Sequence, residues 1–223
     1  MKISVCDIRK KYGRREVLRG VSFEAESGSI IGIVGVNGSG KSTLLGILSG
    51  VLTGKGDFLA DGESLMKDRA LRERVVGYVP QGTPLIEELS AKDNLLLWYS
   101  KKDMESELDS GVLRLLGINE FLKTRVSRMS GGMKKRLSIG CSVAKRPSVI
   151  LLDEPTSALD VLCRKSISDY LRKFREAGGI TIIATHDVKE LDLCDKIYVL
   201  KDGVLTAHDP GEGESRLEEM LTV

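Results

Sequence analysis

Aromatic side chains and net charge are both scarce in this sequence. Phe, Trp and Tyr together make up 4% of the 223 residues, which argues against the stacked aromatic platforms that bind single-stranded nucleic acid. The 34 Lys and Arg residues nearly balance the 32 Asp and Glu residues, so the formal net charge is only +2. A chain this close to neutrality has no overall field that attracts nucleic acid or an anionic membrane, and we expect no nucleic-acid partner.

Cysteine is also rare, and long apolar runs are missing. Cys6, Cys141, Cys163 and Cys194 lie far apart, without the CxxC or Cys–His spacing of a metal site, and we expect reduced thiols in a cytosolic protein. The longest apolar runs, such as Ile30–Val34, are far shorter than the roughly 18 residues that a bilayer span needs. The first residues lack the apolar stretch of a signal peptide. If the protein works at a membrane, another chain must cross it.

The rest of the composition is that of a folded globular protein. Hydrophobic residues make up 41% of the chain and charged residues 30%. Strand and helix patterns alternate, which predicts an α/β fold whose mostly parallel sheet has helices on both faces. Three short apolar runs have the pattern of buried central strands: Ile30–Val34, Val149–Leu152 and Ile180–Ala184. Ile3–Gly28 reads as strand, turn and strand, which predicts an N-terminal antiparallel β subdomain.

Further segments complete this pattern. The expected elements are a strand pair around Asp61-Gly62, a strand over Val75–Val79, helices over Lys41–Gly50, Lys134–Lys145 and Val161–Ala177, and a hairpin over Lys196–Ala207. The stretch Thr83–Arg128 has helical periodicity and few strand signals. We therefore expect one domain, residues 1–223, with a helical subdomain at about residues 83–146 inserted into the α/β core. The polar stretch Gly211–Val223 predicts a short helix at most.

A phosphate-binding loop follows the first buried strand. It fits the pattern GxxxxGK[ST] and lies between a strand and a helix, as that motif requires. The glycines let backbone N–H groups converge on an anion, and the helix N-terminus adds the positive end of a dipole. Lys41 is expected to reach the β- and γ-phosphates, and Ser42 to offer its hydroxyl to Mg²⁺. The predicted nucleotide-binding residues of this loop are Gly35, Val36, Asn37, Gly38, Ser39, Gly40, Lys41, Ser42 and Thr43.

Two acidic residues end the second buried strand. Asp153 and Glu154 follow Val149–Leu152, and ligands of a doubly wound sheet bind beyond the carboxyl ends of its strands. Asp153 is therefore placed to hold Mg²⁺, directly or through water. Glu154 is placed to orient or deprotonate an attacking water. Together with the phosphate loop, this pair predicts a nucleoside triphosphatase.

A second anion site narrows this class. Ser130-Gly131-Gly132 stands at the head of a predicted helix, and one nucleotide has no obvious use for two such sites in one chain. With all three motifs, the chain resembles the nucleotide-binding domain of an ATP-binding cassette (ABC) transporter over nearly its whole length. In that family, ATP is sandwiched between the phosphate loop of one domain and the signature loop of its partner. The resemblance implies ATP hydrolysis with Mg²⁺ in a homodimer or heterodimer.

The resemblance also implies roles for further residues. Tyr12 stands where the family stacks an aromatic ring on adenine, with an ordinary turn tyrosine as the alternative. Gln81 matches the glutamine that reaches Mg²⁺ and water, and His186 matches the switch histidine on the γ-phosphate. The implied catalytic residues are Glu154, His186 and Gln81, the metal ligands Ser42, Gln81 and Asp153, the signature Ser130, Gly131, Gly132 and Met133, and the loop that crosses to the partner Ser157, Ala158, Leu159 and Asp160.

The signature departs from the family's LSGGQ at two positions. Met129 replaces the leucine and Met133 the glutamine, whereas the serine and glycines implied to contact the γ-phosphate remain. The form SGGMK, followed by a basic pair, is similar to ATPases of the ABC-2 exporter type. We interpret Lys134, Lys135 and Arg136 as a solvated helix face rather than a nucleic-acid patch.

The resemblance thus implies an ATP-hydrolysing subunit at the cytoplasmic face of the membrane. Two such domains would dock under a separate membrane-spanning subunit through residues from about Thr83 to Tyr99, and ATP-driven closure would drive transport, with export the expected direction. The alternative is a soluble ABC-type ATPase, for example in iron–sulfur assembly. A P-loop kinase would leave the signature and His186 unexplained.

Overall fold

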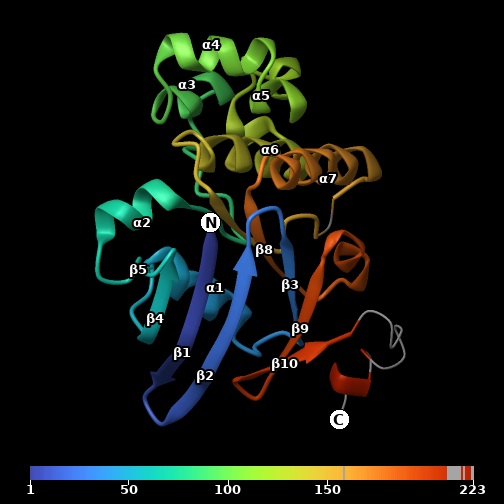
Figure 1. Ribbon diagram of the computed structural model, residues 1–223. Coiled ribbons are helices and arrows are strands. Elements are labelled where there is room, and N and C mark those ends of the chain that lie inside the picture. Colours follow the sequence, from blue (N-terminus) through green and yellow to red (C-terminus); the bar gives the residue numbers. More distant parts are fainter. Residues whose placement is uncertain (158, 210–216, 218, 222–223) are drawn as a thin grey trace.

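Two β-sheets and a set of helices form the computed structural model, which describes residues 1–157, 159–209, 217 and 219–221 (Figure 1). The strands are β1 (Lys2–Tyr12), β2 (Arg15–Glu26), β3 (Ile30–Val34), β4 (Lys55–Ala60), β5 (Glu63–Ser64), β6 (Val76–Val79), β7 (Val149–Asp153), β8 (Ile180–Thr185), β9 (Lys196–Lys201) and β10 (Val204–His208). The helices are α1 (Lys41–Ser49), α2 (Arg69–Val75), α3 (Ala91–Leu96), α4 (Lys101–Asp109), α5 (Val112–Leu115), α6 (Gly131–Ser142) and α7 (Val161–Glu176). Short 3₁₀ helices cover Ile118–Glu120, Val126–Arg128 and Val188–Leu193.

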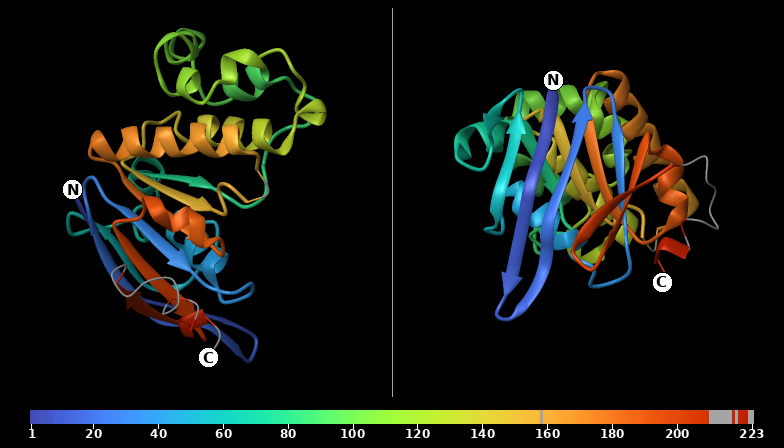
Figure 2. Two further views of the ribbon diagram at one scale, coloured as in Figure 1. Left: turned by 90° about the vertical axis from the view of Figure 1, so that its right-hand side faces the viewer. Right: turned by 60° about the horizontal axis from the view of Figure 1, so that its bottom comes forward.

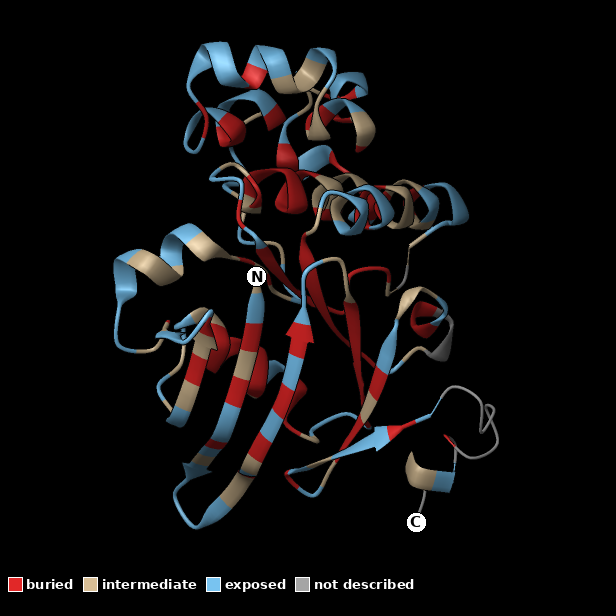
Figure 3. Cartoon of the chain, in the orientation of Figure 1, coloured by how far each residue is buried: buried red, intermediate tan, exposed pale blue. Residues whose placement is uncertain are grey.

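A six-stranded sheet forms the centre of the fold. Its order in the described part of the chain is β10-β9-β3-β8-β7-β6, and every neighbouring pair is parallel except β9 with β10. Every residue of β3, β7 and β8 is buried, because this sheet is covered on both faces (Figure 3). The three apolar runs are thus the central strands, as predicted. Their register brings the carboxyl ends of the three strands, at Val34, Asp153 and Thr185, to one edge of the sheet.

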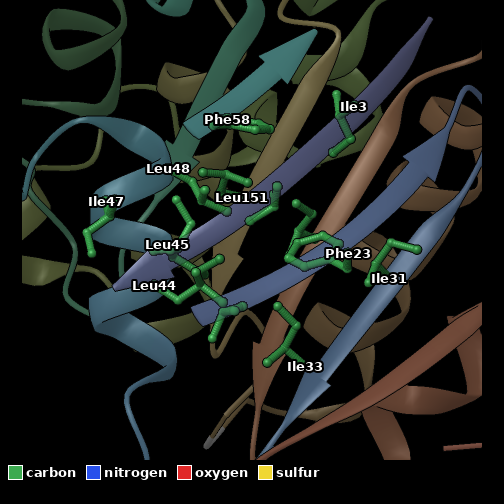
Figure 4. Packing of buried hydrophobic residues seen from close by; sticks show 14 of the residues in the cluster. Ile3, Phe23, Ile31, Ile33, Leu44, Leu45, Ile47, Leu48, Phe58 and Leu151 are labelled. Atoms are coloured by element: carbon green, nitrogen blue, oxygen red, sulfur yellow. The ribbon is translucent and has the colours of Figure 1, made fainter. Parts of the chain in front are cut away.

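One face of this sheet is covered by α1 together with an antiparallel sheet of order β2-β1-β4-β5. Buried and exposed side chains alternate along much of the long β1–β2 hairpin, since only one of its faces meets the core. Each fully buried Ile, Leu or Phe contributes about 1.5–3 kcal/mol through removal of apolar surface from water. The predicted antiparallel subdomain is confirmed. Figure 4 shows the shared core, which includes Ile3, Phe23, Ile31, Leu44, Leu48, Phe58 and Leu151.

The opposite face is covered by α6 and α7, and α3, α4 and α5 lie beyond α6 (Figures 1 and 2). Ile150 and Leu152 point into this second core, whereas Leu151 between them points into the first, as the alternation of a strand requires. Tyr99 ties the outer helices to α6, because its hydroxyl donates a 2.8 Å hydrogen bond to the carbonyl oxygen of Gly140. Helices therefore lie on both faces of the sheet, as predicted. The subdomain limits at residues 83 and 146 stay a prediction.

The structure differs from the expected elements in two places. Val75, expected to begin a strand, ends α2, a helix whose N-cap Asp68 accepts a 2.9 Å hydrogen bond from the N–H of Leu71. Helix α6 covers Gly131–Ser142 rather than Lys134–Lys145, and it begins early because the Ser130 side chain caps it. Most of the predicted tail Gly211–Val223 lies outside the described residues. No helix in the described ranges is both long and apolar enough to cross a membrane.

Candidate functional site

The loop between β3 and α1 has the conformation that the phosphate motif predicts. Gly38 and Gly40 have φ angles of 82° and 111°, a backbone region that glycine adopts without strain. Gly40 is the N-cap of α1, so the first N–H groups of the helix, which lack partners within it, begin at the loop. A Cβ atom on Gly35 would lie 2.5 Å from the carbonyl oxygen of Leu200, so a larger residue does not fit there. The loop is thus suited to bind anions.

Lys41 is held against this loop. It is almost fully buried, and its Nζ donates hydrogen bonds to the carbonyl oxygens of Gly35 at 2.6 Å and Val36 at 3.2 Å. Burial lowers the pKa of Lys41, while the carboxylates of Glu154 and Asp153 oppose that shift. The ammonium group is therefore fixed where phosphate oxygens bound by the loop would meet it.

Asp153 ends β7 as a buried carboxylate, 2% exposed. Burial raises its pKa, and a hydrogen bond with Ser42 opposes the shift. Its Oδ1 has no hydrogen-bond partner among the described residues. Asp153 is not among the described residues that line the neighbouring cavity, but its hydrogen-bond partner Ser42 lines that cavity together with Gln81 and Glu154. Hydroxyl, carboxylate and amide oxygens thus gather in this region. Such oxygens are the ligands that Mg²⁺ prefers, and the residues present therefore fit a magnesium ion.

Glu154 and His186 are in direct contact. Oε1 of Glu154 lies 2.6 Å from Nδ1 of His186. The Glu154 side chain is 6% exposed, whereas that of His186 is 46% exposed. Glu154 has a φ of 48°, unusual for a residue with a side chain, and its N–H donates a 2.8 Å hydrogen bond to the carbonyl oxygen of Ala184. The structure thus joins two predicted catalytic residues from the ends of neighbouring strands.

A polar cavity of about 370 Å³ brings most of the predicted phosphate loop together with Gln81 and Glu154. Arg15 and Val17, both on β2, are wall residues that the motifs did not indicate. The Arg15 guanidinium lies 3.5 Å from the carbonyl oxygen of Gly38. In the sequence, only the basic cluster around Tyr12 could have indicated that Arg15 belongs to the site. The cavity is lined by Arg15, Val17, Asn37, Gly38, Gly40, Lys41, Ser42, Thr43, Gln81 and Glu154.

Other residues of the predicted site do not line this cavity in the described part of the chain. Tyr12 is not among the described residues that line the cavity; its ring is about half exposed, with the Nζ of Lys10 5.0 Å from the ring centroid. Both interpretations of Tyr12 therefore stay open. Val36 is exposed, and the buried hydroxyl of Ser39 has no partner within the described chain.

The signature does not contribute to the cavity of the same chain. The Ser130 side chain accepts a hydrogen bond from the N–H of Met133, which starts α6 at the signature. Gly131 is exposed, and a Cβ atom there would meet nothing within 4 Å. A Cβ atom on Gly132 would instead lie 2.4 Å from Sγ of Cys163, because this glycine packs against α7. None of the cavity-lining residues in the described ranges comes from the signature.

The predicted crossing loop leads into α7. Asp160 caps that helix by accepting a 2.9 Å hydrogen bond from the N–H of Cys163. Ala158 lies outside the described residues, and the roles of Ser157 and Leu159 stay predictions. The start of this loop is held by Glu190, a residue that sequence reasoning missed, since Glu190 Oε1 accepts hydrogen bonds from the Thr156 N–H, at 2.7 Å, and hydroxyl.

The interpretation of the basic run on α6 as a solvated face is wrong for two of its residues. Lys135 is 5% exposed, and its Nζ donates to the carbonyl oxygens of Pro80 and Gln81. Arg136 donates to the carbonyl oxygen of Leu116 and lies over a phenylalanine ring, that of Phe121. Partners from distant segments thus turn both cations inward, which the local charge pattern does not show.

Comparison with known proteins decides the family. The family model described as ABC transporter matches residues 18–157, more than half of the chain. The chain belongs to the ABC transporter family. The matched stretch holds the phosphate loop, Gln81, the signature and the Asp153-Glu154 pair, and the chain is thus an ATP-binding cassette of a family of ATPases.

Two curated relatives show the range of names in this family. The linearmycin resistance ATP-binding protein LnrL of Bacillus subtilis is 32% identical over 207 residues, which cover 90% of this cassette and 67% of LnrL. The Nod factor export ATP-binding protein I of Rhizobium meliloti is 32% identical over 222 residues, which cover 96% of this cassette and 65% of that protein. The cassette thus spans about two thirds of the length of these relatives. Import proteins match as well.

A solved structure confirms the fold. The dimeric structure of a post-hydrolysis state of the ATP-binding cassette MJ0796, bound to ADP and Pi, has a TM-score of 0.81 and 27% sequence identity to this cassette. The match covers 93% of this cassette and 98% of that chain. The α/β core with its antiparallel β subdomain is therefore the ABC ATPase fold.

Proposed function

We propose that this cassette is the ATP-hydrolysing subunit of an ABC transporter. The observation that carries the proposal is the convergence of the phosphate loop, Gln81 and Glu154 on one polar cavity. The loop and Lys41 bind the phosphates, and Glu154 orients or deprotonates the attacking water. Ser42, Gln81 and Asp153 are the residues that would hold Mg²⁺. His186, in contact with Glu154, faces the γ-phosphate. The bound Mg²⁺ supplies neutralisation of the charge that develops on the phosphate oxygens.

A second cassette completes the site in this proposal. Ser130 and Gly131 are exposed and start α6, whose N-terminal N–H groups suit an anion. Because they lie apart from the chain's own cavity, the phosphate that they contact is bound by another chain. The dimeric structure of the similar MJ0796 supports this arrangement. ATP then closes the dimer, and hydrolysis reopens it.

A separate membrane-spanning subunit is the third component. The segment after Gln81 exposes four large apolar side chains: Ile86, Leu96, Leu97 and Trp98. Trp98 also borders a groove of about 400 Å³ between this segment, β6 and α6. Such a surface suits an apolar helix of a partner better than water. We place the cassette at the cytoplasmic face of the membrane and favour export, on the resemblance of its SGGMK signature to ABC-2 exporters.

Co-isolation from membranes tests this assignment. The tagged cassette, purified in detergent from its native membranes, is expected to bring down one integral membrane protein, identified by mass spectrometry. Trp98→Ser should reduce that recovery, because it removes the largest exposed apolar contact. Val204→Ser, at an exposed apolar position on β10, is the matched control and should leave recovery unchanged. Recovery of the cassette without any membrane protein, or equal recovery with both variants, contradicts the proposal.

A further inference from the structure

Lys135 is a buried cation that joins two functional segments of one chain. It lies on α6, five residues after the signature serine, and is 5% exposed. Its Nζ donates hydrogen bonds to the carbonyl oxygens of Pro80, at 3.0 Å, and Gln81, at 3.2 Å. Those carbonyls belong to the turn that follows β6 and carries the predicted metal and water ligand. Figure 3 shows the buried part of α6 above the sheet.

Three acidic residues favour the charged form of Lys135 against the effect of its burial. Burial lowers its pKa, and Asp153, Glu190 and Glu154 oppose that shift through their negative charges. Burying an ammonium group is costly unless it is paired and hydrogen-bonded. A buried apolar side chain avoids that cost, as Leu137 and Ile139 do at other positions of the same helix. The ammonium group therefore has a use beyond packing.

Helix α6 makes a stiff connection between the signature and Lys135. At 1.5 Å of rise per residue, five residues place them about 7.5 Å apart along the helix axis. Both lie in one uninterrupted helix, whose later residues pack in the core. A displacement of the Ser130 end is therefore passed to Lys135, and through its hydrogen bonds to the carbonyl oxygens of Pro80 and Gln81 it reaches the turn that carries Gln81.

We propose that Lys135 is a positioning residue, which holds the backbone of Gln81 in register with the signature helix and thereby couples the two nucleotide sites of a dimer. The proposal rests on the proposed function, because it needs the signature of each chain to contact the nucleotide of the other. When a partner's ATP seats on Ser130, the movement of α6 sets Gln81 at the chain's own site. Lys135 itself touches no substrate.

The test compares steady-state ATP hydrolysis by the wild type, Lys135→Met and Lys135→Arg. Methionine keeps an unbranched, flexible side chain that ends one atom short of the ammonium group, and it removes the hydrogen-bond donors. We expect kcat to fall roughly 10- to 100-fold, since small displacements of a catalytic group have effects of that size. The ATP dissociation constant should stay within about twofold, because Lys41 and the phosphate loop are untouched. The proposal predicts a Hill coefficient above 1 for the wild type and of about 1 for Lys135→Met, as expected when coupling is lost.

Two controls separate positioning from stability. Lys135→Arg keeps a cationic donor and should recover most of kcat and cooperativity. Lys173→Met removes an exposed lysine from α7 and should change neither. Thermal unfolding checks the fold of each variant.

Three results would overturn the proposal. The first is a Lys135→Met protein with the kcat and cooperativity of the wild type. The second is a wild type that shows no cooperativity. The third is a Lys135→Met protein in which ATP affinity, kcat and unfolding temperature all fall, together with a Lys135→Arg protein that restores none of them. Failure of the proposed function is seen separately. It would appear as wild-type turnover in Glu154→Gln, whatever Lys135→Met does.

Discussion

The carboxylate of Glu154 and the ring of His186 meet at 2.6 Å, although 32 residues separate them in the sequence. Strands β7 and β8 are parallel neighbours, with Asp153 opposite Ala184. The two strands therefore end at the same edge of the sheet, and the residues that follow them are brought together. Parallel pairing thus assembles an acid–imidazole pair beside the phosphate loop.

Lys41→Ala should weaken ATP binding about tenfold or more. The substitution removes an ammonium group that is already held beside the loop, and a charge-assisted hydrogen bond contributes about 1.5–3 kcal/mol. Titration with a labelled ATP analogue measures the dissociation constant. Lys173→Ala, at an exposed position on α7, is the matched control. An unchanged dissociation constant in Lys41→Ala would contradict the assignment of this loop to phosphate binding.

Gly131→Asp should allow ATP binding but block ATP-dependent dimers. A Cβ atom at Gly131 has open space, so the fold tolerates the new side chain, whose charge would repel the γ-phosphate of a partner's ATP. Gly131→Asn, of nearly equal size but neutral, separates charge from bulk and should dimerise better. The molar mass with ATP, measured by light scattering in a Glu154→Gln background, reports the result. Dimers of Gly131→Asp equal to those of the parent would contradict a shared site.

Thiol labelling of the folded protein should modify one cysteine rapidly. Cys6 is exposed, whereas burial raises the pKa of Cys141 and of Cys194 to about 12 and also raises that of Cys163. A maleimide reacts with the thiolate, so these three should react slowly at neutral pH. Intact-mass measurement should show one rapid maleimide addition to the native wild type and none to native Cys6→Ser. The denatured wild type should take up four. Several fast additions to the native protein would be inconsistent with this fold.

Much of the site was predictable because its residues follow apolar strands at fixed spacings. The phosphate loop comes directly after β3, and Asp153-Glu154 comes at the end of β7, so the sheet places both. The fold class follows from the same runs. Helix α2 was missed because it is short and, of its residues, all of them described, only Leu71 and Val75 pack against the core, both only partly buried, which is too little to establish a helical periodicity.

Contacts between segments that are far apart in the chain could not be predicted from the sequence. Lys135 and Pro80 are 55 residues apart, and Thr156 and Glu190 are 34 residues apart. Each pair places a charged side chain in the interior, where a local charge pattern predicts an exposed one. Arg15 was missed for a similar reason, since the hairpin that carries it reaches the phosphate loop only after the two sheets pack together.

Glu154→Gln tests the central claim, ATP hydrolysis at this cavity, most directly. The amide keeps the size of the side chain but cannot act as a base, so the account predicts wild-type ATP affinity with turnover reduced severely, by about 100-fold or more. The measurement is phosphate release with saturating MgATP, alongside the ATP dissociation constant. Retained binding with almost no phosphate release is the predicted result. Turnover near that of the wild type would contradict the role of Glu154 and with it the proposed catalytic site.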